Sequence, residues 1–287
     1  MRNCKTFFRA TAMIAAALTL AVPAARSQAL RGDFNMDGKV DIADVTGTIG
    51  FLLNDGLPPC EPERDTVMAG GVPIVMVHVQ GGTFITLDLF PRTVEMTDFW
   101  IAETEVTYEL WNAVMNPTGS STQGSKQAYY RMDWDACQEF IARLNGMTGM
   151  DFRLPSDDEW VYAAIGGNRS MFCRYAGGND PCEVGWFQDN KPSGSTMQVG
   201  AKAPNELGLY DMSGNVMEYI DDVHISEVDV SENEDGSEIV EYVGCFMRGG
   251  SVDFESTSDQ ALLKNSYYLV TIRGRRPAGA CGLRLVR

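Results

Sequence analysis

Histidine is scarce in this chain, and its cysteines form no metal-binding pattern. The 287 residues include only two histidines, His78 and His224, which are too few for a metal site built from several imidazoles. None of the seven cysteines belongs to a Cys-x-x-Cys pair or to a cysteine–histidine cluster. The chain therefore lacks the sequence features of zinc-binding domains and of histidine-rich metal centres.

Positive charge is also in short supply. The chain carries 23 lysine and arginine residues against 39 aspartate and glutamate residues, a formal net charge of −16. Nucleic-acid phosphates require a positive surface, so this balance argues against a nucleic acid as partner. It is consistent with a calcium-rich environment outside the cell, or simply with solubility.

Long apolar runs are missing, apart from one close to the N-terminus. Residues 10–22 are almost uncharged, but they fall short of the roughly 20 apolar residues that span a bilayer. Basic residues precede this run and small residues around Ser27 follow it, so residues 1–27 are predicted to be a secretory signal peptide. We expect an exported protein, periplasmic, at the cell surface or secreted, with no membrane span. Cleavage removes four basic residues and no acidic ones, which lowers the net charge to −20.

Six cysteines remain in the expected mature chain. An even number in an exported protein permits disulfides, although the sequence does not choose among the pairings. Cys173 and Cys182 enclose the turn-rich stretch RYAGGNDP and are the favoured pair.

The rest of the chain divides into two parts of unequal size. We expect a small acidic module at residues 28–57, a linker with paired prolines at 58–67, and one larger domain at 68–287. The larger domain shows no β-α-β rhythm and has frequent glycine-rich turns. It is predicted to be an α+β domain with much irregular structure.

Two helices can be placed from their caps. Residues 132–145 predict a helix with Asp133 as its N-cap, because apolar residues recur there at three- and four-residue spacing. Ser156 and Glu159 stand at capping-box spacing and predict a helix over residues 157–165. The apolar face of the first helix is formed by Trp134, Cys137, Phe140, Ile141 and Leu144.

Other segments give weaker signals. A third helix is expected within 104–115, and strands are expected at 74–79, 82–90 and 282–287. Nine acidic residues and no basic ones lie between residues 221 and 241. Such a run could form a metal site, but a flexible solvated loop is the favoured interpretation.

The stretch DFNMDGKVDIAD, residues 33–44, has the spacing of a calcium-binding loop. Its oxygen donors recur at the positions that surround one hard cation, with Gly38 at the sharp turn, and a helix is expected directly after it. The expected ligands are the side chains of Asp33, Asn35, Asp37, Asp41 and Asp44, and the backbone carbonyl of Lys39. The sequence therefore predicts calcium as a cofactor.

This module resembles half of a dockerin, the calcium module that docks enzymes onto cohesins. The last ligand, Asp44, is an aspartate in place of the usual glutamate, and only one of the two loops of a dockerin is found. A cohesin-like partner and a calcium-stiffened N-terminal spacer both remain open.

Five phrases of the larger domain occur in a characteristic order and spacing. They are FWIAETEVTYELWNAVM, FRLPSDDEWVYAAIGG, PNELGLYDMSGNVMEYIDD, MRGGSV and GLRLV, and the resemblance that they carry covers about residues 73–287. In these phrases the domain resembles the formylglycine-generating enzyme family, also called the sulfatase-modifying factor family. The resemblance implies a compact α+β fold related to C-type lectins.

The enzymes of that family oxidise a sulfatase cysteine to formylglycine with oxygen and copper, and they use two cysteines. The positions that match these cysteines here hold Phe254 and Asp259. A phenyl ring and a carboxylate cannot replace soft thiolates as ligands of Cu(I). The iron-dependent relatives need several histidines, which this chain lacks. Catalysis of the family type is therefore expected to be absent.

The resemblance also implies a second calcium site, within the larger domain. Its ligands are the side chain of Asp211, the backbone carbonyls of Gly214 and Val216, and the carboxylate of Glu218. Oxygen donors from one short segment suit a hard cation that stabilises the fold by binding only the folded state.

The C-terminal segment of this fold lines its ligand surface. Here the segment mixes aromatic, acidic and hydroxyl side chains, which suits adaptable recognition, although each aromatic residue is equally compatible with an ordinary structural role. The domain also resembles the variable proteins of diversity-generating retroelements, with Leu283 in place of their closing phenylalanine. The expected contact residues are Asp253, Phe254, Glu255, Asp259, Tyr267 and Tyr268.

Three functions follow from these observations. The first is recognition of a protein or glycan ligand by a non-catalytic domain, which includes a diversified receptor. The second is a formylglycine-generating type of oxidoreductase, or another modifying enzyme, with an altered active site; no nucleophile–base pair is visible for it. The third is a calcium-dependent scaffold docked through the N-terminal module. The replacement of both copper cysteines favours the first.

Overall fold

The computed structural model describes most of the larger domain. The described residues are 62–86, 92–115, 125–130, 132–171, 173–192, 196–230, 238–256, 267–272 and 279–287, with only the backbone described over 222–230, 238–245 and 267–272. The chain divides into two units, Met1–Pro58 and Pro59–Arg287, and all described residues belong to the second. The expected signal peptide, the calcium loop and residues 58–61 of the linker lie outside the described residues, whereas residues 64–67 of the linker belong to a strand.

Three antiparallel strands form the first sheet. In spatial order they are β1 (Arg64–Ala69), β2 (Val72–Val79) and β5 (Phe99–Ala102). Alternate residues of β2 enter two different hydrophobic clusters, Ile74 and Met76 on one face and Val77 and Val79 on the other. Because both faces of the central strand are covered, the strand is apolar along most of its length, as the sequence of residues 74–79 predicted.

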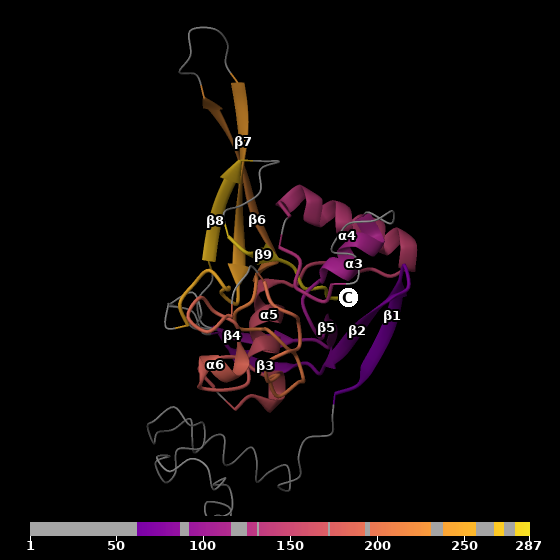
Figure 1. The fold of residues 1–287 in the computed structure, drawn as a ribbon, viewed down its shortest axis with the longest axis vertical. Helices are drawn as coiled ribbons and strands as arrows, with labels where there is room; N and C mark the ends of the chain where they lie inside the picture. Colours follow the sequence, from indigo (N-terminus) through magenta and orange to yellow (C-terminus); the bar gives the residue numbers. More distant parts are fainter. Residues whose placement is uncertain are drawn as a thin grey trace, which may run out of the picture. The chain divides into compact units, whose positions relative to one another are not determined.

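Helices α3 (Tyr108–Met115) and α4 (Trp134–Thr148) pack against each other and against this sheet (Figure 1). Asp133 caps α4 as predicted, because its side chain accepts a hydrogen bond from the backbone N of Ala136 at 2.8 Å. Losing such a cap costs about 1 kcal/mol. Of the expected apolar face, Trp134 is half-buried and the other four residues are buried: Cys137, Phe140, Ile141 and Leu144.

Helix α5 (Asp157–Ala164) begins with the predicted capping box. Ser156 Oγ accepts a hydrogen bond from the backbone N of Glu159 at 3.2 Å, and the Glu159 carboxylate accepts one from the backbone N of Ser156 at 2.8 Å. Two backbone N–H groups that the helix itself cannot satisfy are thereby paired. The helix carries Trp160, which is fully buried, into the second cluster.

The remaining short elements depart from the sequence expectations. Of the strand expected at 82–90, the described residues form β3 (Gly82–Ile85), which pairs with β4 (Thr93–Met96), and residues 87–90 lie outside the described residues. The strand expected at 282–287 is wrong for most of its length, because β9 (Cys281–Gly282) has two residues and Val286 makes only isolated bridges. Two further short helices are η1 (Gly167–Arg169) and α6 (Pro181–Val184).

The longest strands belong to a four-stranded sheet in the order β8, β7, β6, β9. Strands β6 (Met217–Val230) and β7 (Glu238–Arg248) pair antiparallel as a long hairpin that extends away from the helices in Figure 1. Strand β8 (Tyr267–Ile272) pairs with β7, and β9 pairs with β6 in parallel. The flexible loop expected over 221–241 is therefore wrong where the chain is described, since β-branched residues alternate with the acidic ones and favour a strand.

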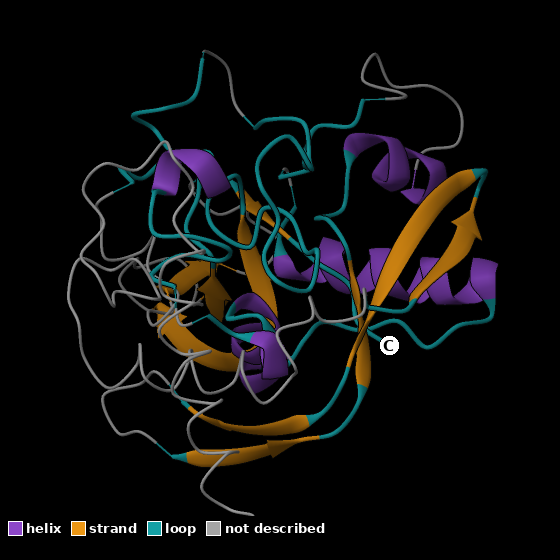
Figure 2. Cartoon of the chain, turned by 90° about the horizontal axis from the view of Figure 1, so that it is seen from below, coloured by secondary structure: helices purple, strands orange, loops and turns teal. Residues whose placement is uncertain are grey.

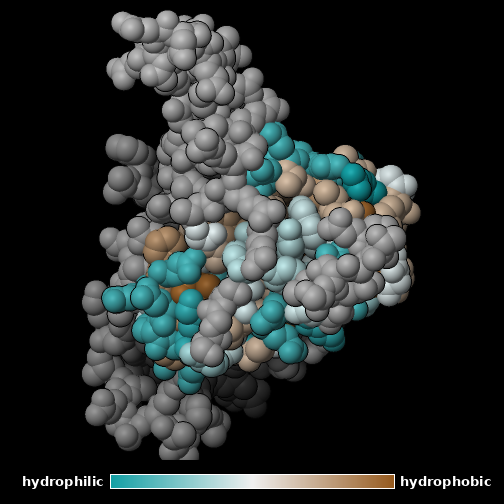
Figure 3. All heavy atoms as spheres, turned by 45° about the horizontal axis from the view of Figure 1, so that its top comes forward, coloured by the Kyte–Doolittle hydropathy of each residue, from teal (hydrophilic) through white to brown (hydrophobic). Residues whose placement is uncertain are grey.

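Irregular segments connect these elements over much of the domain, as the sequence predicted (Figure 2). Hydrophilic residues cover much of the described surface in Figure 3, interrupted by small hydrophobic areas. Within the described part of the chain, no helix has both the length and the apolar character needed to cross a membrane.

Candidate functional site

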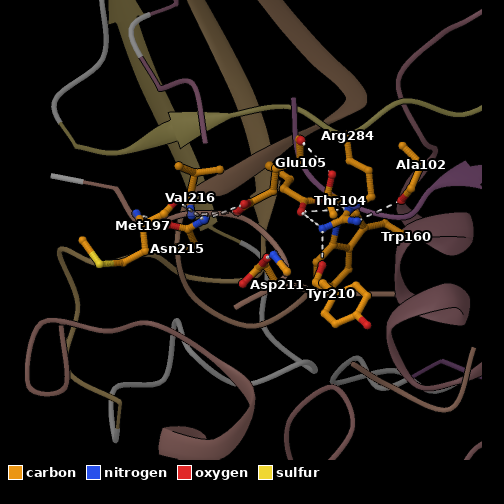
Figure 4. A network of polar contacts seen from close by, with 12 residues as sticks. Ala102, Thr104, Glu105, Trp160, Met197, Tyr210, Asp211, Asn215, Val216 and Arg284 are labelled. Atoms are coloured by element: carbon orange, nitrogen blue, oxygen red, sulfur yellow. Dashed lines mark hydrogen bonds and ion pairs between the residues drawn. The ribbon is translucent and has the colours of Figure 1, made fainter. Parts of the chain in front are cut away.

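Four charged side chains lie in the interior of the domain and interact with one another (Figure 4). Glu105 and Asp211 are each 2% exposed, and Glu218 and Arg284 are 0% exposed. They come from four separate segments: the turn after β5, the loop before β6, the first residues of β6 and the chain after β9. We call this group the charged centre. Ionised, it holds three carboxylates against one guanidinium.

Glu218 and Arg284 form the ion pair of the charged centre. Arg284 Nε lies 3.0 Å from both Glu218 oxygens, and Arg284 Nη2 lies 2.7 Å from Oε1. Trp160 Nε1 donates a further hydrogen bond to Glu218 Oε2 at 2.6 Å. The other donors of Arg284 bond the carbonyls of Ala102 at 2.9 Å and Tyr210 at 2.7 Å. Both partners are therefore well satisfied, as a buried ion pair must be.

Glu105 lies beside the loop that precedes β6. Its Oε2 accepts a hydrogen bond from Asn215 Nδ2 at 2.6 Å, and its Oε1 accepts one from the backbone N of Val216 at 3.0 Å. Burial raises the pKa of Glu105 well above its usual value, and the negative charges of Asp211 and Glu218 raise it further. Glu105 has no ion-pair partner of its own among the described residues.

Asp211 is the incompletely satisfied member of the charged centre. Its Oδ2 accepts a hydrogen bond from the backbone N of Gly200 at 2.7 Å, whereas its Oδ1 is buried and has no hydrogen-bond partner. Burial raises the pKa of Asp211 to about 6. A buried oxygen without a partner is costly, and in a native structure it indicates a missing proton, water or ion.

The loop from Asp211 to Val216 adopts an unusual backbone conformation. Asp211 (φ 57°) and Asn215 (φ 56°) both lie in the left-handed region, which non-glycine residues rarely occupy. Neighbouring loops hold this conformation: Asn215 N donates to the carbonyl of Trp186 at 2.8 Å, and Asn215 Oδ1 accepts from Met197 N at 2.8 Å. Such strain persists only where the surroundings over-determine it, and it often marks functional sites.

The segment after Arg-Gly-Gly-Ser, residues 251–256, is also fixed by hydrogen bonds. Asp253 Oδ2 accepts from the backbone N of Ala280 at 2.7 Å, and the carbonyl of Phe254 accepts from Gln188 N at 2.8 Å. The Phe254 side chain is half-buried and packs against the main hydrophobic cluster. Asp253 and Phe254 therefore help to hold the segment, and both Asp253 and Glu255 are exposed.

Three of the expected contact residues cannot be placed in this way. Asp259 lies outside the described residues. Tyr267 and Tyr268 begin β8, opposite Met247 and Phe246 of β7, and only their backbone is described.

The cysteines do not form the expected disulfide. Cys173 is half-buried and Cys182 is exposed, and both are free thiols in the structure. Tyr175 and Gly178 pair as a tight turn, which places residue 180, and not Cys182, across from Cys173. Burial, with the Glu206 carboxylate as a second cause, raises the pKa of Cys173 to about 12, so its thiol resists ionisation.

Comparison with known proteins assigns the chain to a protein family. Residues 72–287 match the family model of the sulfatase-modifying factor enzyme 1-like domain. The chain belongs to this family. The membership confirms the resemblance found in the five sequence phrases; it does not test the N-terminal calcium loop.

Two relatives have names that indicate different functions, one a chaperone and the other an enzyme. The chaperone protein LppX of Paenibacillus barcinonensis is 30% identical over 231 residues, which cover 62% of this chain and 80% of LppX. The formylglycine-generating enzyme of Thermomonospora curvata is 28% identical over 158 residues, which cover 50% of this chain and 47% of the enzyme.

Solved structures show that the fold is shared more widely than the sequence. Treponema denticola variable protein 1 superposes with a TM-score of 0.59 at 24% identity, covering 78% of this chain and 99% of that protein. PvdO from Pseudomonas aeruginosa gives a TM-score of 0.59 at 18% identity, covering 79% of this chain and 99% of PvdO. At these identities the likeness shows the fold of a sulfatase-modifying factor domain and no particular activity.

The calcium site implied by the family fits the charged centre in part. Asp211 fits, because its buried Oδ1 lacks a partner and the surrounding carboxylates exceed the positive charge. Glu218 does not fit, because both its oxygens accept hydrogen bonds from Arg284 and one of them accepts a further bond from Trp160. In the described part of the chain, no three acidic, histidine or cysteine side chains converge as a metal site. The backbone carbonyls of Gly214 and Val216 would have to complete it.

The sequence analysis did not single out Glu105, Arg284, Trp160 or Asn215 as members of a site. A signal was present for Arg284, which stands between Leu283 and Leu285 in a stretch that is otherwise apolar. A charge in an apolar stretch is seldom buried without a partner, so Arg284 could have been expected to pair inside the domain.

Proposed function

We propose that this chain is an exported, calcium-binding protein whose sulfatase-modifying factor domain recognises a ligand and does not carry out copper-dependent oxidation. The observation that carries the proposal is Phe254, which matches the first copper cysteine of the family enzymes. Its side chain packs against the main hydrophobic cluster, and its backbone is hydrogen-bonded to Gln188. A phenyl ring there offers no thiolate for Cu(I).

Recognition is the activity that remains for a domain with this fold and no thiolate at that position. The hydrogen bonds of Asp253, Phe254 and Ser256 hold residues 251–256 in one conformation, which lowers the entropy lost when a ligand binds. Glu255 is exposed on this fixed segment. We expect a protein or glycan ligand, and the acidic surface of the chain favours a neutral or basic one.

Calcium is proposed at two places. The loop at residues 33–44 has the ligand spacing of a calcium-binding loop, and the charged centre carries an unsatisfied Asp211 oxygen inside an excess of negative charge. Calcium at the charged centre would stabilise the fold, because it binds only the folded chain. Calcium in the loop would order the N-terminal module, as a spacer or for a cohesin-like partner.

An oxidation assay tests the non-catalytic part of the proposal. The full chain is incubated with copper, oxygen and a sulfatase-type cysteine peptide, and formylglycine is measured by mass spectrometry. We expect no aldehyde above the level of copper alone. The double variant Phe254→Cys and Asp259→Cys is the matched control, because it restores two thiols and is expected to gain Cu(I) binding. Enzymatic aldehyde formation by the unmodified chain would contradict the proposal.

A capture experiment tests recognition. The purified chain is immobilised and exposed to secreted proteins and surface glycans from its own source, with calcium or with a chelator. A specific ligand that is lost when the 251–256 segment is altered supports the proposal. A ligand that depends only on residues 33–44 would instead favour the docked scaffold.

A second candidate function is suggested by LppX. A relative named as a chaperone, matched over 80% of its length, favours a protein client over a glycan. Aggregation of a chemically denatured exported protein, measured with and without this chain, tests this version. Suppression at equimolar chain, absent with an unrelated acidic protein, is the expected result. Equal suppression by both proteins would exclude a specific chaperone activity.

A further inference from the structure

A polar pocket lies between the end of β2, the turn before β5, η1 and the loop that follows α6. Its volume is about 240 Å³. The residues that line it include His78, Gln80, Asp98, Asn168, Arg169 and Leu207. None of these residues belongs to the charged centre or to residues 251–256, so the pocket is separate from the sites described above.

Two amide side chains of the pocket bond each other. Asn168 Nδ2 donates a hydrogen bond to Gln80 Oε1 at 3.1 Å. Both residues are exposed, and within the described part of the chain neither side chain makes a further hydrogen bond. The bonded pair therefore leaves one acceptor, the Asn168 carbonyl, and one donor, the Gln80 amino group, for a ligand.

An imidazole held by a carboxylate adds a further polar group. His78 Nε2 lies 3.2 Å from Asp98 Oδ2, and the His78 ring packs on Trp100 with the ring centroids 5.0 Å apart. Asp98 Oδ1 accepts a hydrogen bond from the backbone N of Gly81 at 2.8 Å, which fixes the carboxylate. His78 Nδ1 has no hydrogen-bond partner among the described residues. His78 therefore keeps one nitrogen for a ligand, in an orientation that its neighbours hold.

The backbone beside the pocket is held by close packing. Tyr162 is 1% exposed, and its hydroxyl donates a hydrogen bond to the carbonyl of Gln80 at 3.2 Å. A Cβ at Gly81 would come within 2.3 Å of the Met96 carbonyl oxygen, so only glycine fits where the chain passes from Gln80 towards β3. A lining held in this way loses little entropy when a ligand enters.

The chemistry of the pocket suits a neutral ligand rich in hydroxyl groups. With His78 neutral, the two carboxylates of Glu63 and Asp98 exceed the one charge of Arg169, which disfavours an anion. A metal cation needs several converging oxygens, and both oxygens of Asp98 are already engaged. Hydroxyl groups both donate and accept, as the mixture of amide, imidazole and guanidinium groups requires.

The size of the pocket limits the ligand further. Sites that enclose drug-sized ligands measure roughly 300–1,000 Å³, so about 240 Å³ favours a single small ring. A sugar ring combines this size with adjacent hydroxyl groups. We infer that the pocket binds one neutral sugar unit, the terminal residue of a glycan, through the Gln80–Asn168 amide pair and His78. The inference is independent of recognition by residues 251–256 and gives the domain a second binding site.

Nuclear magnetic resonance on the full chain tests the inference. Saturation transfer detects the weak binding expected of a single sugar, and titration gives its affinity. The probes are the methyl glycosides of glucose, galactose, mannose, fucose and N-acetylglucosamine, with glucuronic acid and inorganic phosphate as anionic comparisons. We expect at least one neutral probe to bind, and both anions to bind more weakly. Gln80→Ala and Asn168→Ala should each weaken that neutral probe about fivefold or more, because each removes a hydrogen-bonding group.

Controls separate a lost contact from a damaged fold. Gln138→Ala removes an exposed amide from α4, and it is expected to change neither the sugar affinity nor the melting temperature. Asn168→Asp keeps the size of the side chain but cannot donate to Gln80 Oε1, and it gives a second reading if an alanine variant fails to fold.

The outcomes decide between this pocket and other places. Weakened sugar binding in the Gln80 and Asn168 variants, with unchanged melting temperatures and an unchanged Gln138→Ala, supports the inference. Failure of every neutral probe to bind the unmodified chain overturns it. Sugar binding that the double variant Gln80→Ala and Asn168→Ala retains also overturns it, because the sugar then binds elsewhere on the chain.

Discussion

The charged centre and the segment at residues 251–256 are both fixed by hydrogen bonds, yet they use their side chains differently. In the charged centre the charged groups are buried, Glu218 is paired with Arg284, and Glu105 and Asp211 accept hydrogen bonds from neighbouring loops, so each replacement should disturb the fold. In the segment, backbone groups make many of the bonds, and Glu255 remains exposed. A domain built in this way can change its surface residues while its interior stays constant.

Helix α5 connects the two regions. Trp160 donates to Glu218 in the charged centre, and Asp157 accepts two hydrogen bonds from Arg248, the residue that precedes the Gly-Gly-Ser turn, at 2.7 and 2.6 Å. Arg248 is only 3% exposed. A single helix therefore links the position of the segment to that of the interior.

The largest expected effect comes from removing the guanidinium of the charged centre. Arg284→Met leaves three buried carboxylates without their positive partner, and breaking such a pair costs about 3–5 kcal/mol. The loss is measured by urea unfolding. Arg143→Met removes an exposed arginine from an i,i+4 pair and is expected to cost under about 0.5 kcal/mol. Similar losses of unfolding free energy in both variants would contradict the view that the buried ion pair stabilises the fold more than the exposed one.

A smaller effect is expected at Phe254, the position that matches the first copper cysteine of the family enzymes. Phe254→Ala removes a half-buried ring and should cost about 1–2 kcal/mol, less than the roughly 3–5 kcal/mol for a fully buried phenylalanine. Phe140→Ala, in a fully buried position of α4, provides that reference. The comparison is made by urea unfolding of both variants. A loss at Phe254 as large as at Phe140 would show that the segment belongs to the core and not to a recognition surface.

How much of this could be read from the sequence differs between the two regions. The caps at Asp133 and Ser156 were predicted because they are local, depending on residues three positions apart. The pairing of Glu218 with Arg284 was not, because it joins residues 66 positions apart and no local pattern encodes it. The acidic charge alone gave a wrong prediction for residues 221–230 and 238–241, where strand-forming side chains between the acidic ones favour a strand.

The connecting helix should be sensitive to acid. Burial alone would raise the pKa of Glu159, but the hydrogen bonds from Arg153 and Ser156 outweigh it, so the pKa is lowered. A carboxyl group with a lowered folded pKa stabilises above its unfolded pKa, near 4.3, and this stability is lost as pH falls through the folded value. Glu159→Gln keeps the capping box but has no carboxyl group to protonate. Between about pH 5 and pH 3, its free energy of unfolding should therefore fall by about 1 kcal/mol less than that of the unmodified chain. The expected difference is no larger because Arg153 is half-exposed, and solvent screens its ion pair with Glu159. An identical pH profile in both proteins would contradict this linkage.

The smallest expected effect on stability, and the most specific one on function, belongs to Glu255. It is exposed and makes no hydrogen bond among those described for residues 251–256, so Glu255→Ala should change the free energy of unfolding by less than about 0.5 kcal/mol. The same change removes a charge from a conformation held by Asp253 and Ser256, so a ligand that contacts the segment should bind more weakly. Both quantities are measured on one preparation, by urea unfolding and by the capture assay. Glu139→Ala, on the exposed side of α4, is the matched control and should alter neither. Unchanged capture of a specific ligand by Glu255→Ala would place recognition outside this segment. The variant removes one exposed charge and leaves the backbone of the segment fixed, so a ligand that contacts Glu255 should detect the change.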